Sequence, residues 1–231
     1  MFIYDASGYS GALGLNISQI SFNGERRKMG NRFKKNICVF CSSSNTLAKE
    51  FYADAELFGE LLAKAGFDLV YGGSNVGTMY SVAKKAKENG SKVYGVMPKK
   101  LHSFGVYSEE CDEYYLTDNM RNRKTKLDEL SDGVVAMPGG FGTLEEVSEI
   151  LCHKQLGYNN KPIVFLNTNG FFDHLLEFFQ NISDNSFSKN SVHNLYYVAD
   201  TPQEAVDYLL NYEYGAKEVK PEDIYTTAIA G

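Results

Sequence analysis

The sequence predicts a doubly wound α/β domain with a Rossmann-like arrangement, in which helices cover both faces of a parallel sheet. Short apolar runs alternate with amphipathic stretches of helical length from Asn36 to about residue 212. The runs are apolar on both faces, which is typical of buried parallel strands. Polar or glycine-rich loops follow three of them, at 42–46, 72–78 and 138–143. Ligands bind at the carboxyl ends of such strands, so we expect these loops to meet at one site.

The elements follow one another in a regular order. A strand at 37–41 leads into a helix at 51–65 that ends at Gly66, and a strand at 67–71 leads into a helix that ends at Asn89-Gly90. The remaining expected elements are a strand at 92–97, a loop at 98–111, a strand at 114–116, a charged helix at roughly 118–130, a strand at 133–137 with a long helix after it, a strand at 162–166, a helix at 171–179, a strand at 196–198 and a helix opening at 201–202.

Composition bounds the class of protein. The chain has 231 residues, of which 43% are hydrophobic and 23% charged, as in a soluble domain of ordinary size. A net charge of −6 argues against a broad nucleic-acid-binding face, because such faces are usually basic. No run reaches the ~20 apolar residues that span a bilayer, and the N-terminus lacks the apolar core of a signal peptide. We expect a cytoplasmic protein without nucleic-acid or membrane partners.

The two ends of the chain differ from its middle. Residues 1–35 lack a sustained apolar period and carry the basic cluster Arg26-Arg27-Lys28. We expect an N-terminal extension at 1–35, the Rossmann-like domain at 36–212 and a polar tail at 213–231. A second hypothesis takes Met29 as the native start, because Gly-Glu-Arg-Arg-Lys before it matches the translation of a purine-rich ribosome-binding leader.

The cysteines and histidines show no metal or redox pattern. Cys38-x-x-Cys41 lies in and at the end of a predicted strand, and no second pair completes a zinc set. We therefore expect buried structural thiols and no metal. The four histidines have neither ligand nor triad spacing and are expected to be surface or packing residues.

The stretch Pro-Gly-Gly-Phe-Gly-Thr-Leu-Glu-Glu at 138–146 is the strongest candidate for function. An apolar run precedes it and a helical pattern follows, so it reads as strand, glycine turn and helix. Such a turn exposes backbone amides to an anion, and the helix N-terminus adds partial positive charge. The alternative is a purely structural tight turn, since the motif is neither a Walker loop nor GxGxxG.

Charged residues flank this turn on both sides. Arg121-Asn122-Arg123-Lys124 lies on the preceding helix, and Glu145-Glu146 lies in the first turn of the following one. Taken alone, the basic cluster is explained as a solvated helix face, and the acidic pair is explained by its favourable interaction with the helix dipole. Beside an anion site, a cation and a carboxylate together suggest chemistry on a phosphorylated substrate.

The motif at 138–146 resembles the PGGxGTxxE signature of the LOG family, the cytokinin riboside 5′-monophosphate phosphoribohydrolases sometimes mislabelled as lysine decarboxylases. Further matches occur in order and at similar spacing between residue 36 and about 210. They are Val70-Tyr-Gly-Gly73, Val76-Gly-x-Met79, Met120-x-x-Arg-Lys124, Gln155-Leu-Gly157 and Asn167-x-Asn-Gly170.

The resemblance implies hydrolysis of the N-glycosidic bond of a nucleoside 5′-monophosphate, such as AMP or a cytokinin riboside monophosphate, to free base and ribose 5-phosphate. It places the catalytic arginine on Arg123 and the catalytic glutamate on Glu146, and it implies a homodimer and no cofactor. The substrate-binding positions that it matches are Ser43, Gly73, Lys124, Gly139, Gly140, Phe141, Gly142 and Thr143. A carboxylate suits the reaction because glycosidic cleavage builds positive charge on the sugar.

Several residues depart from the family pattern. Ser42, Ser74 and Tyr80 stand where glycines are usual, Arg121 where a histidine is usual, and Cys152-His153 where Thr-Trp is usual. The larger side chains at the three glycine positions either narrow the pocket or are accommodated by repacking. The sequence does not specify which base is preferred. The alternative function is a non-catalytic nucleotide or molybdenum-cofactor carrier, which needs the phosphate loop without the catalytic pair. A pyridoxal-phosphate decarboxylase is disfavoured, since no lysine has a recognisable Schiff-base setting.

Overall fold

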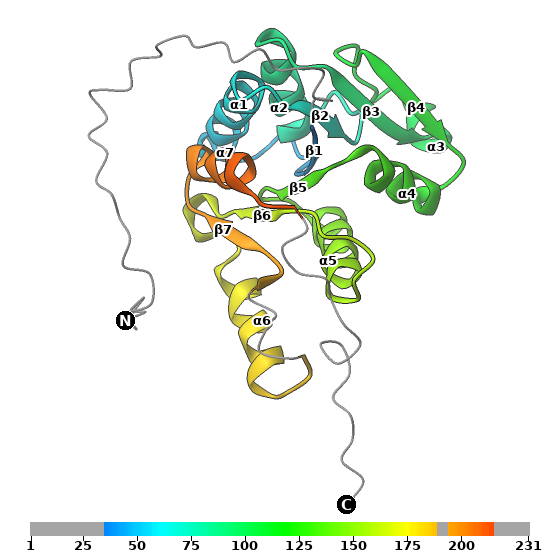
Figure 1. Cartoon of the computed structure of the whole chain (residues 1–231). Coiled ribbons are helices and arrows are strands. Elements are labelled where there is room, and N and C mark those ends of the chain that lie inside the picture. Colours follow the sequence, from blue (N-terminus) through cyan, green and yellow to red (C-terminus); the bar gives the residue numbers. More distant parts are fainter. Residues whose placement is uncertain (1–34, 189–193, 215–231) are drawn as a thin grey trace, which may run out of the picture. The chain divides into compact units, whose positions relative to one another are not determined.

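Seven parallel strands form the sheet in the order β4-β3-β2-β1-β5-β6-β7 (Figure 1). The computed structural model describes residues 35–188 and 194–214, and these counts refer to that part of the chain. In chain order the elements are β1 (Asn36–Phe40), α1 (Lys49–Lys64), β2 (Asp68–Tyr71), α2 (Gly77–Glu88), β3 (Val93–Pro98), α3 (Lys99–His102), β4 (Glu113–Thr117), α4 (Met120–Leu130), β5 (Gly133–Ala136), α5 (Phe141–Gln155), β6 (Ile163–Leu166), the 3₁₀ turn η2 (Thr168–Gly170), α6 (Asp173–Asp184), β7 (Tyr197–Ala199) and α7 (Pro202–Asn211).

This architecture confirms the predicted doubly wound α/β fold. Helices α1, α2 and α7 pack on one face of the sheet, and α4, α5 and α6 pack on the other. The alternation of side chains along a strand explains the two cores, because Ile37 and Val39 of β1 face the first layer, while Cys38 and Phe40 face the second. The strands read as apolar on both sides because both sides are covered.

Local chemistry sets several helix ends. Helix α4 begins at Met120, because the Asn119 side chain accepts a hydrogen bond from the backbone N–H of Asn122 at 2.9 Å. Helix α7 begins at Pro202, after Thr201 accepts a bond from the Glu204 N–H at 3.3 Å.

Two of the expected boundaries were wrong. The stretch 98–111 is not all loop, since it opens with the one-turn helix α3 before the chain turns at Gly105 with φ of 76°. The helix expected at 171–179 instead runs from Asp173 to Asp184. The Asn167 side chain accepts a bond from the Phe172 N–H at 2.7 Å, so the preceding turn η2 delays the helix start.

The order of strands changes direction beside β1. The chain moves outward from β1 through β2, β3 and β4, and then returns to place β5 on the opposite side of β1. The loops that leave β1 and β5 therefore lead to helices on opposite faces, and in doubly wound sheets ligands bind at such a point, outside the carboxyl ends of the strands. This switch point lies where the sequence predicted the site.

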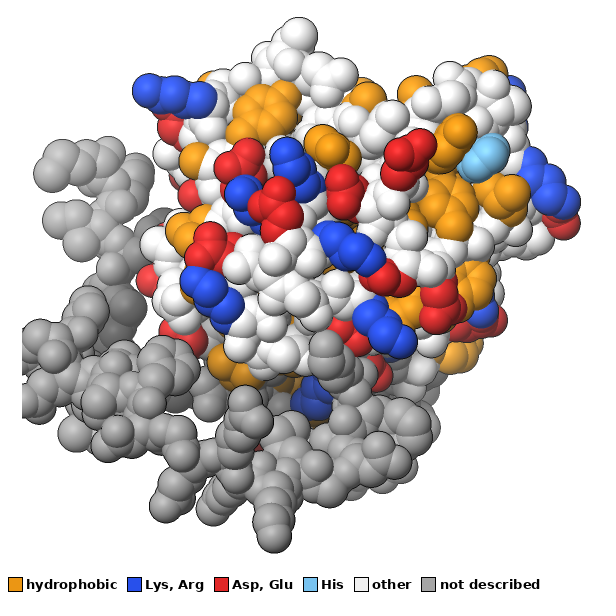
Figure 2. Space-filling model, turned by 90° about the horizontal axis from the view of Figure 1, so that it is seen from above, with side chains coloured by type: hydrophobic (Ala, Val, Ile, Leu, Met, Phe, Trp, Pro, Cys, Tyr) orange, Lys and Arg blue, Asp and Glu red, His pale blue; other side chains and the backbone are white. Residues whose placement is uncertain are grey.

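Parts of the predicted organisation lie outside the described residues. These are the N-terminal extension up to residue 34, His193 and the tail from residue 215 onward. Within the described residues, no helix is both long and apolar enough to cross a membrane. On the face shown in Figure 2, acidic and basic side chains are interspersed.

Candidate active site

The three loops that follow β1, β2 and β5 contact one another, as the sequence predicted. The Thr143 hydroxyl donates to the Cys41 carbonyl at 3.1 Å, which joins the glycine turn to the end of β1. The backbone N–H of Ser42 donates to the Thr78 hydroxyl at 3.0 Å, and that of Gly77 donates to the Asn45 side chain at 2.8 Å. These bonds hold all three loops at the switch point.

The glycine turn combines one crowded position with two open ones. A Cβ added at Gly139 would lie 2.1 Å from the Thr143 hydroxyl oxygen, so only glycine fits there. At Gly140 and Gly142 a Cβ would meet no atom within 4 Å. The first N–H groups of α5 have no acceptor within the helix and adjoin this open space. An anion placed there would also meet the positive end of the helix dipole.

Arg123 of α4 and Glu146 of α5 form a buried ion pair through Nη1 and Oε1, with 9% and 7% of each residue exposed. The guanidinium is fixed from a second side, because Nε donates to the Val96 carbonyl of β3 at 3.1 Å. On a third side the backbone of Gly72 approaches so closely that a Cβ there would lie 2.5 Å from Nη2. The arginine of α4 is therefore held by α5, by β3 and by the turn that follows β2.

The environment of Glu146 balances two opposing effects. Burial raises the pKa of its carboxyl group, and the charge and hydrogen bond of Arg123 act in the opposite direction. The carboxylate also lines a cavity of about 110 Å³ together with Phe40, Asp128 and His153. A poorly hydrated carboxylate next to open space is suited to stabilise a cation or to accept a proton from water.

The two neighbouring glutamates have different surroundings. The Glu145 side chain is 55% exposed and pairs with Lys124, whereas Glu146 points inward to Arg123. Lys124 also pairs with Glu149, and the hydrogen bonds that its amine donates to the Glu145 and Glu149 carboxylates raise the pKa of that amine. A phosphorylated substrate would compete with both carboxylates for Lys124, so its assignment to substrate binding stays a prediction.

Of the remaining predicted binding residues, Ser43 and Phe141 are exposed and Gly73 is buried. Ser43 is exposed in the loop after β1, beside Gly77. Phe141 is 91% exposed at the start of α5. Gly73 has φ of 72°, and its carbonyl accepts bonds from the Tyr114 hydroxyl and the Ser108 N–H, both at 2.9 Å. Tyr114 was missed from the sequence because it lies in a predicted strand, where a tyrosine is an ordinary residue.

Among the departures from the family pattern, two serines have structural roles. The Ser42 hydroxyl accepts a bond from the Ser44 N–H at 3.0 Å, and that of Ser74 donates to the Val106 carbonyl at 3.0 Å. Tyr80 donates to Glu110 at 3.3 Å and lines a hollow of about 490 Å³ beside the loop after α3. Arg121 and Cys152 are exposed, so neither lines the buried pair.

Two buried thiols and two of the imidazoles have defined surroundings among the described residues. Cys38 and Cys41 are buried, and burial raises the pKa of Cys41 to about 12, so its thiol stays protonated. His102 stacks on Tyr107 with ring centroids 4.5 Å apart. His153 meets Tyr158 edge to face at 5.9 Å. Among the described residues, no three His, Cys, Asp or Glu side chains gather as a metal site.

Comparison with known proteins relates the chain to one family. A family model described as "Possible lysine decarboxylase" matches residues 79–209. The chain is 38% identical to the probable cytokinin riboside 5′-monophosphate phosphoribohydrolase LOGL2 of Oryza sativa subsp. japonica, over 78% of this chain and 74% of that protein. It is 36% identical to the cytokinin riboside 5′-monophosphate phosphoribohydrolase LOG5 of Arabidopsis thaliana, over 79% of each.

Solved structures show a second likeness. The molybdenum cofactor binding protein of Rippkaea orientalis superposes with a TM-score of 0.61 and 26% identity, over 77% of this chain and 96% of that one. The Moco carrier protein of Chlamydomonas reinhardtii gives a TM-score of 0.59 and 25% identity over the same shares. This chain therefore shares its fold with the molybdenum cofactor proteins. The family model and the sequence relatives agree with the motif at 138–146. The chain belongs to the LOG family.

Proposed function

We propose that this protein hydrolyses the N-glycosidic bond of a nucleoside 5′-monophosphate, releasing the free base and ribose 5-phosphate. The observation that carries the proposal is the buried Arg123–Glu146 pair, which lies about one helical turn from the glycine turn. A 5′-phosphate bound at the start of α5 would bring the ribose next to Glu146. The relatives named as phosphoribohydrolases support the same reaction.

The proposed chemistry uses the charge of Glu146. As the C1′–N bond breaks, its electron pair leaves with the base, and positive charge develops on the sugar ring. The Glu146 carboxylate stabilises this charge and accepts a proton from the water whose oxygen bonds to C1′. The departing base takes up a proton from solvent at its nitrogen, and Glu146 returns its proton to solvent, so that one water molecule is consumed. Arg123 keeps the carboxylate ionised and aimed, and the glycine turn restricts the substrate to a reactive position.

The proposed phosphate site supports a 5′-monophosphate as the substrate, and the names of the relatives guide the choice of base. We propose purine riboside 5′-monophosphates, with AMP and the cytokinin riboside monophosphates after which the relatives are named as the first to assay. The test incubates the protein with both monophosphates and with unphosphorylated adenosine, and measures free base by chromatography. We expect release from a monophosphate and little from adenosine. Equal rates on adenosine would contradict the role of the glycine turn.

A carrier of the molybdenum cofactor is the second candidate, favoured by the two superposed structures. This function needs an anion site but no buried carboxylate beside it. Measuring binding and base release on the same preparation distinguishes the two. Tight retention of a pterin phosphate without base release from any monophosphate would favour the carrier.

We further propose a cytoplasmic homodimer. Large apolar side chains are exposed near the site, including Phe141 at 91%, Met120 at 46% and Leu144 at 37%. A second copy of the chain packed against these side chains would remove their apolar surface from water. Sedimentation equilibrium is expected to give twice the mass of 25.8 kDa, and Phe141→Asp is expected to weaken the association. A mass of one chain at all concentrations would contradict the dimer.

A further inference from the structure

The backbone turn that supports Arg123 is itself held in place by a residue of another strand. Gly72 lies against the guanidinium, and Gly73 directly follows it with φ of 72°. The Gly73 carbonyl accepts the Tyr114 hydroxyl at 2.9 Å. Tyr114 belongs to β4, the strand at the edge of the sheet, so the bond links the edge strand to the end of β2 across β3.

The ring of Tyr114 fits between two glycines. A Cβ at Gly73 would lie 2.8 Å from the Tyr114 hydroxyl oxygen, and a Cβ at Gly95 would lie 3.0 Å from its ring. Gly95 precedes Val96, whose carbonyl accepts the Nε–H of Arg123 at 3.1 Å. The same ring therefore packs against both backbone segments that seat the arginine.

The hydroxyl of Tyr114 acts as a donor at the Gly73 carbonyl. Burial raises the pKa of Tyr114, while the nearby charge of Arg123 lowers it to a smaller degree. The phenol thus remains protonated at neutral pH and can donate to the carbonyl.

We propose that Tyr114 is a positioning residue for the reaction, holding the Gly72–Gly73 turn and the Val96 carbonyl so that Arg123 meets Glu146 in one orientation. This inference rests on the proposed function of the Arg123–Glu146 pair. Tyr114 does not touch the substrate in this scheme. Its contribution passes through the backbone to the guanidinium and from there to the carboxylate.

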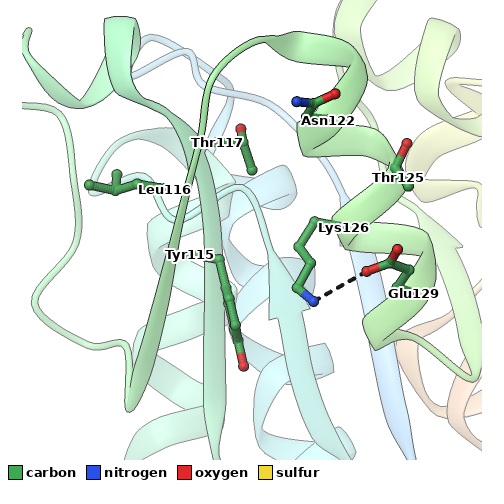
Figure 3. Close-up of a pocket in the computed structure, with 7 residues that line it drawn as sticks. All are labelled: Tyr115, Leu116, Thr117, Asn122, Thr125, Lys126 and Glu129. Carbon is green, nitrogen blue, oxygen red and sulfur yellow. Dashed lines mark hydrogen bonds and ion pairs between the residues drawn. The ribbon is translucent and has the colours of Figure 1, made fainter.

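Tyr115 supplies a matched control on the opposite face of the same strand. Its side chain points into the groove between β4 and α4, next to Lys126, as Figure 3 shows. The Lys126 amine lies 5.1 Å from the centroid of the Tyr115 ring, and the Tyr115 hydroxyl donates to Glu113 at 2.6 Å. Tyr115→Phe also removes one phenolic hydroxyl from β4, but this hydroxyl is not the one that lies against Gly73.

The first test compares Tyr114→Phe with Tyr115→Phe by steady-state kinetics on the best monophosphate substrate. We expect kcat of Tyr114→Phe to fall about three- to ten-fold, as for the loss of one hydrogen bond, with KM changed less than about two-fold. We expect KM to change little because the phosphate turn is held to the end of β1 by the Thr143 hydroxyl. Tyr115→Phe is expected to retain full kcat, and equal kcat for the two variants would overturn the proposal.

A double-mutant cycle with Arg123→Lys separates positioning from a general loss of stability. If Tyr114 acts through Arg123, then the loss from Tyr114→Phe nearly disappears once the guanidinium is replaced. Multiplicative losses in the double variant would show that Tyr114 acts elsewhere.

The second test needs no turnover. The exchange rate of the Arg123 Nε–H with water, followed by NMR on the full chain, is expected to rise at least about five-fold in Tyr114→Phe and to stay unchanged in Tyr115→Phe. An unchanged rate in Tyr114→Phe would overturn the positioning role. Absence of base release from wild-type protein would instead refute the proposed function, and the exchange result would still decide the role of Tyr114.

Discussion

Arg123 and Glu146 lie 23 residues apart in the chain and form one buried ion pair between α4 and α5. Each of the two residues is more than nine-tenths buried. Removing either partner leaves a buried charge without compensation, which is costly in a protein interior. The pair is therefore both the candidate catalytic centre and a point where mutation tests the mechanism directly.

Glu146→Gln is expected to abolish base release, by at least about 100-fold, while nucleotide binding largely survives. The amide has the same shape as the carboxylate but carries no charge and accepts no proton. Turnover is measured by chromatography of the free base and binding by calorimetry.

Glu145→Gln serves as the matched control for Glu146→Gln. Glu145 is the adjacent carboxylate, half exposed and paired with Lys124. We expect this variant to retain most of the turnover. Normal turnover in Glu146→Gln would remove Glu146 from the mechanism.

The pH dependence of turnover is expected to report the Glu146 carboxyl. Its pKa is raised by burial, and the proposed reaction needs the ionised form, so kcat/KM is expected to fall as the pH decreases through that pKa. Arg123 opposes the shift, because its charge and hydrogen bond stabilise the carboxylate. In Arg123→Gln the acid limb of the profile is expected to move to higher pH, with a lower plateau. An acid limb that stays in place would contradict the coupling of the two groups.

Gly139→Ala is expected to destabilise the protein by about 1–3 kcal/mol, as for other overpacked sites. The new methyl would collide with the Thr143 hydroxyl, which holds the turn to Cys41. Urea unfolding measures the loss.

Gly142→Ala is the control, because a methyl there meets no atom of the protein within 4 Å. We expect unchanged or slightly higher stability, since alanine favours a helix more than glycine does. If the open space holds substrate, KM also rises in this variant. A stability loss as large as that of Gly139→Ala would show that the turn is crowded throughout.

Lys154 gives a stability prediction that is separate from the site. This residue is 6% exposed, and its amine donates to the Lys161 carbonyl at 2.8 Å and contacts the Tyr212 hydroxyl at 3.3 Å. Burial lowers the pKa of the amine to about 8. Because this value lies below that of the unfolded chain, the unfolded state binds more protons between about pH 8 and 10, and the stability contributed by Lys154 rises with pH in that range.

The variant that tests this is Lys154→Met, which keeps the length of the side chain and removes the titrating amine. The difference in unfolding free energy between wild type and variant is expected to change with pH by up to about 1.4 kcal/mol per pH unit between pH 8 and 10. Taking this difference cancels the contribution of tyrosines that titrate in or near this pH range, because wild type and variant both contain them. A constant difference across this range would contradict the lowered pKa.

Much of the fold could be predicted from the sequence because its signals are local. Apolar runs such as Val134-Val135-Ala136 indicate buried strands wherever they occur, and helix starts such as Asn119 are encoded within three or four residues. The boundaries that failed, at α3 and at η2, depend on weak one-turn signals. The family resemblance came from residues spread along the chain, whose order is visible without coordinates.

What the sequence alone determined was the doubly wound fold, the glycine turn at 138–146 and the residue types available for chemistry. Only the tertiary structure showed that Arg123 is seated by the Val96 carbonyl and the Gly72 backbone, and that Tyr114 holds this seat. It also separated Glu145, facing solvent and Lys124, from Glu146, facing Arg123. The reason is physical: a motif specifies local backbone geometry, whereas burial and ion pairing depend on which distant elements the packed sheet brings together.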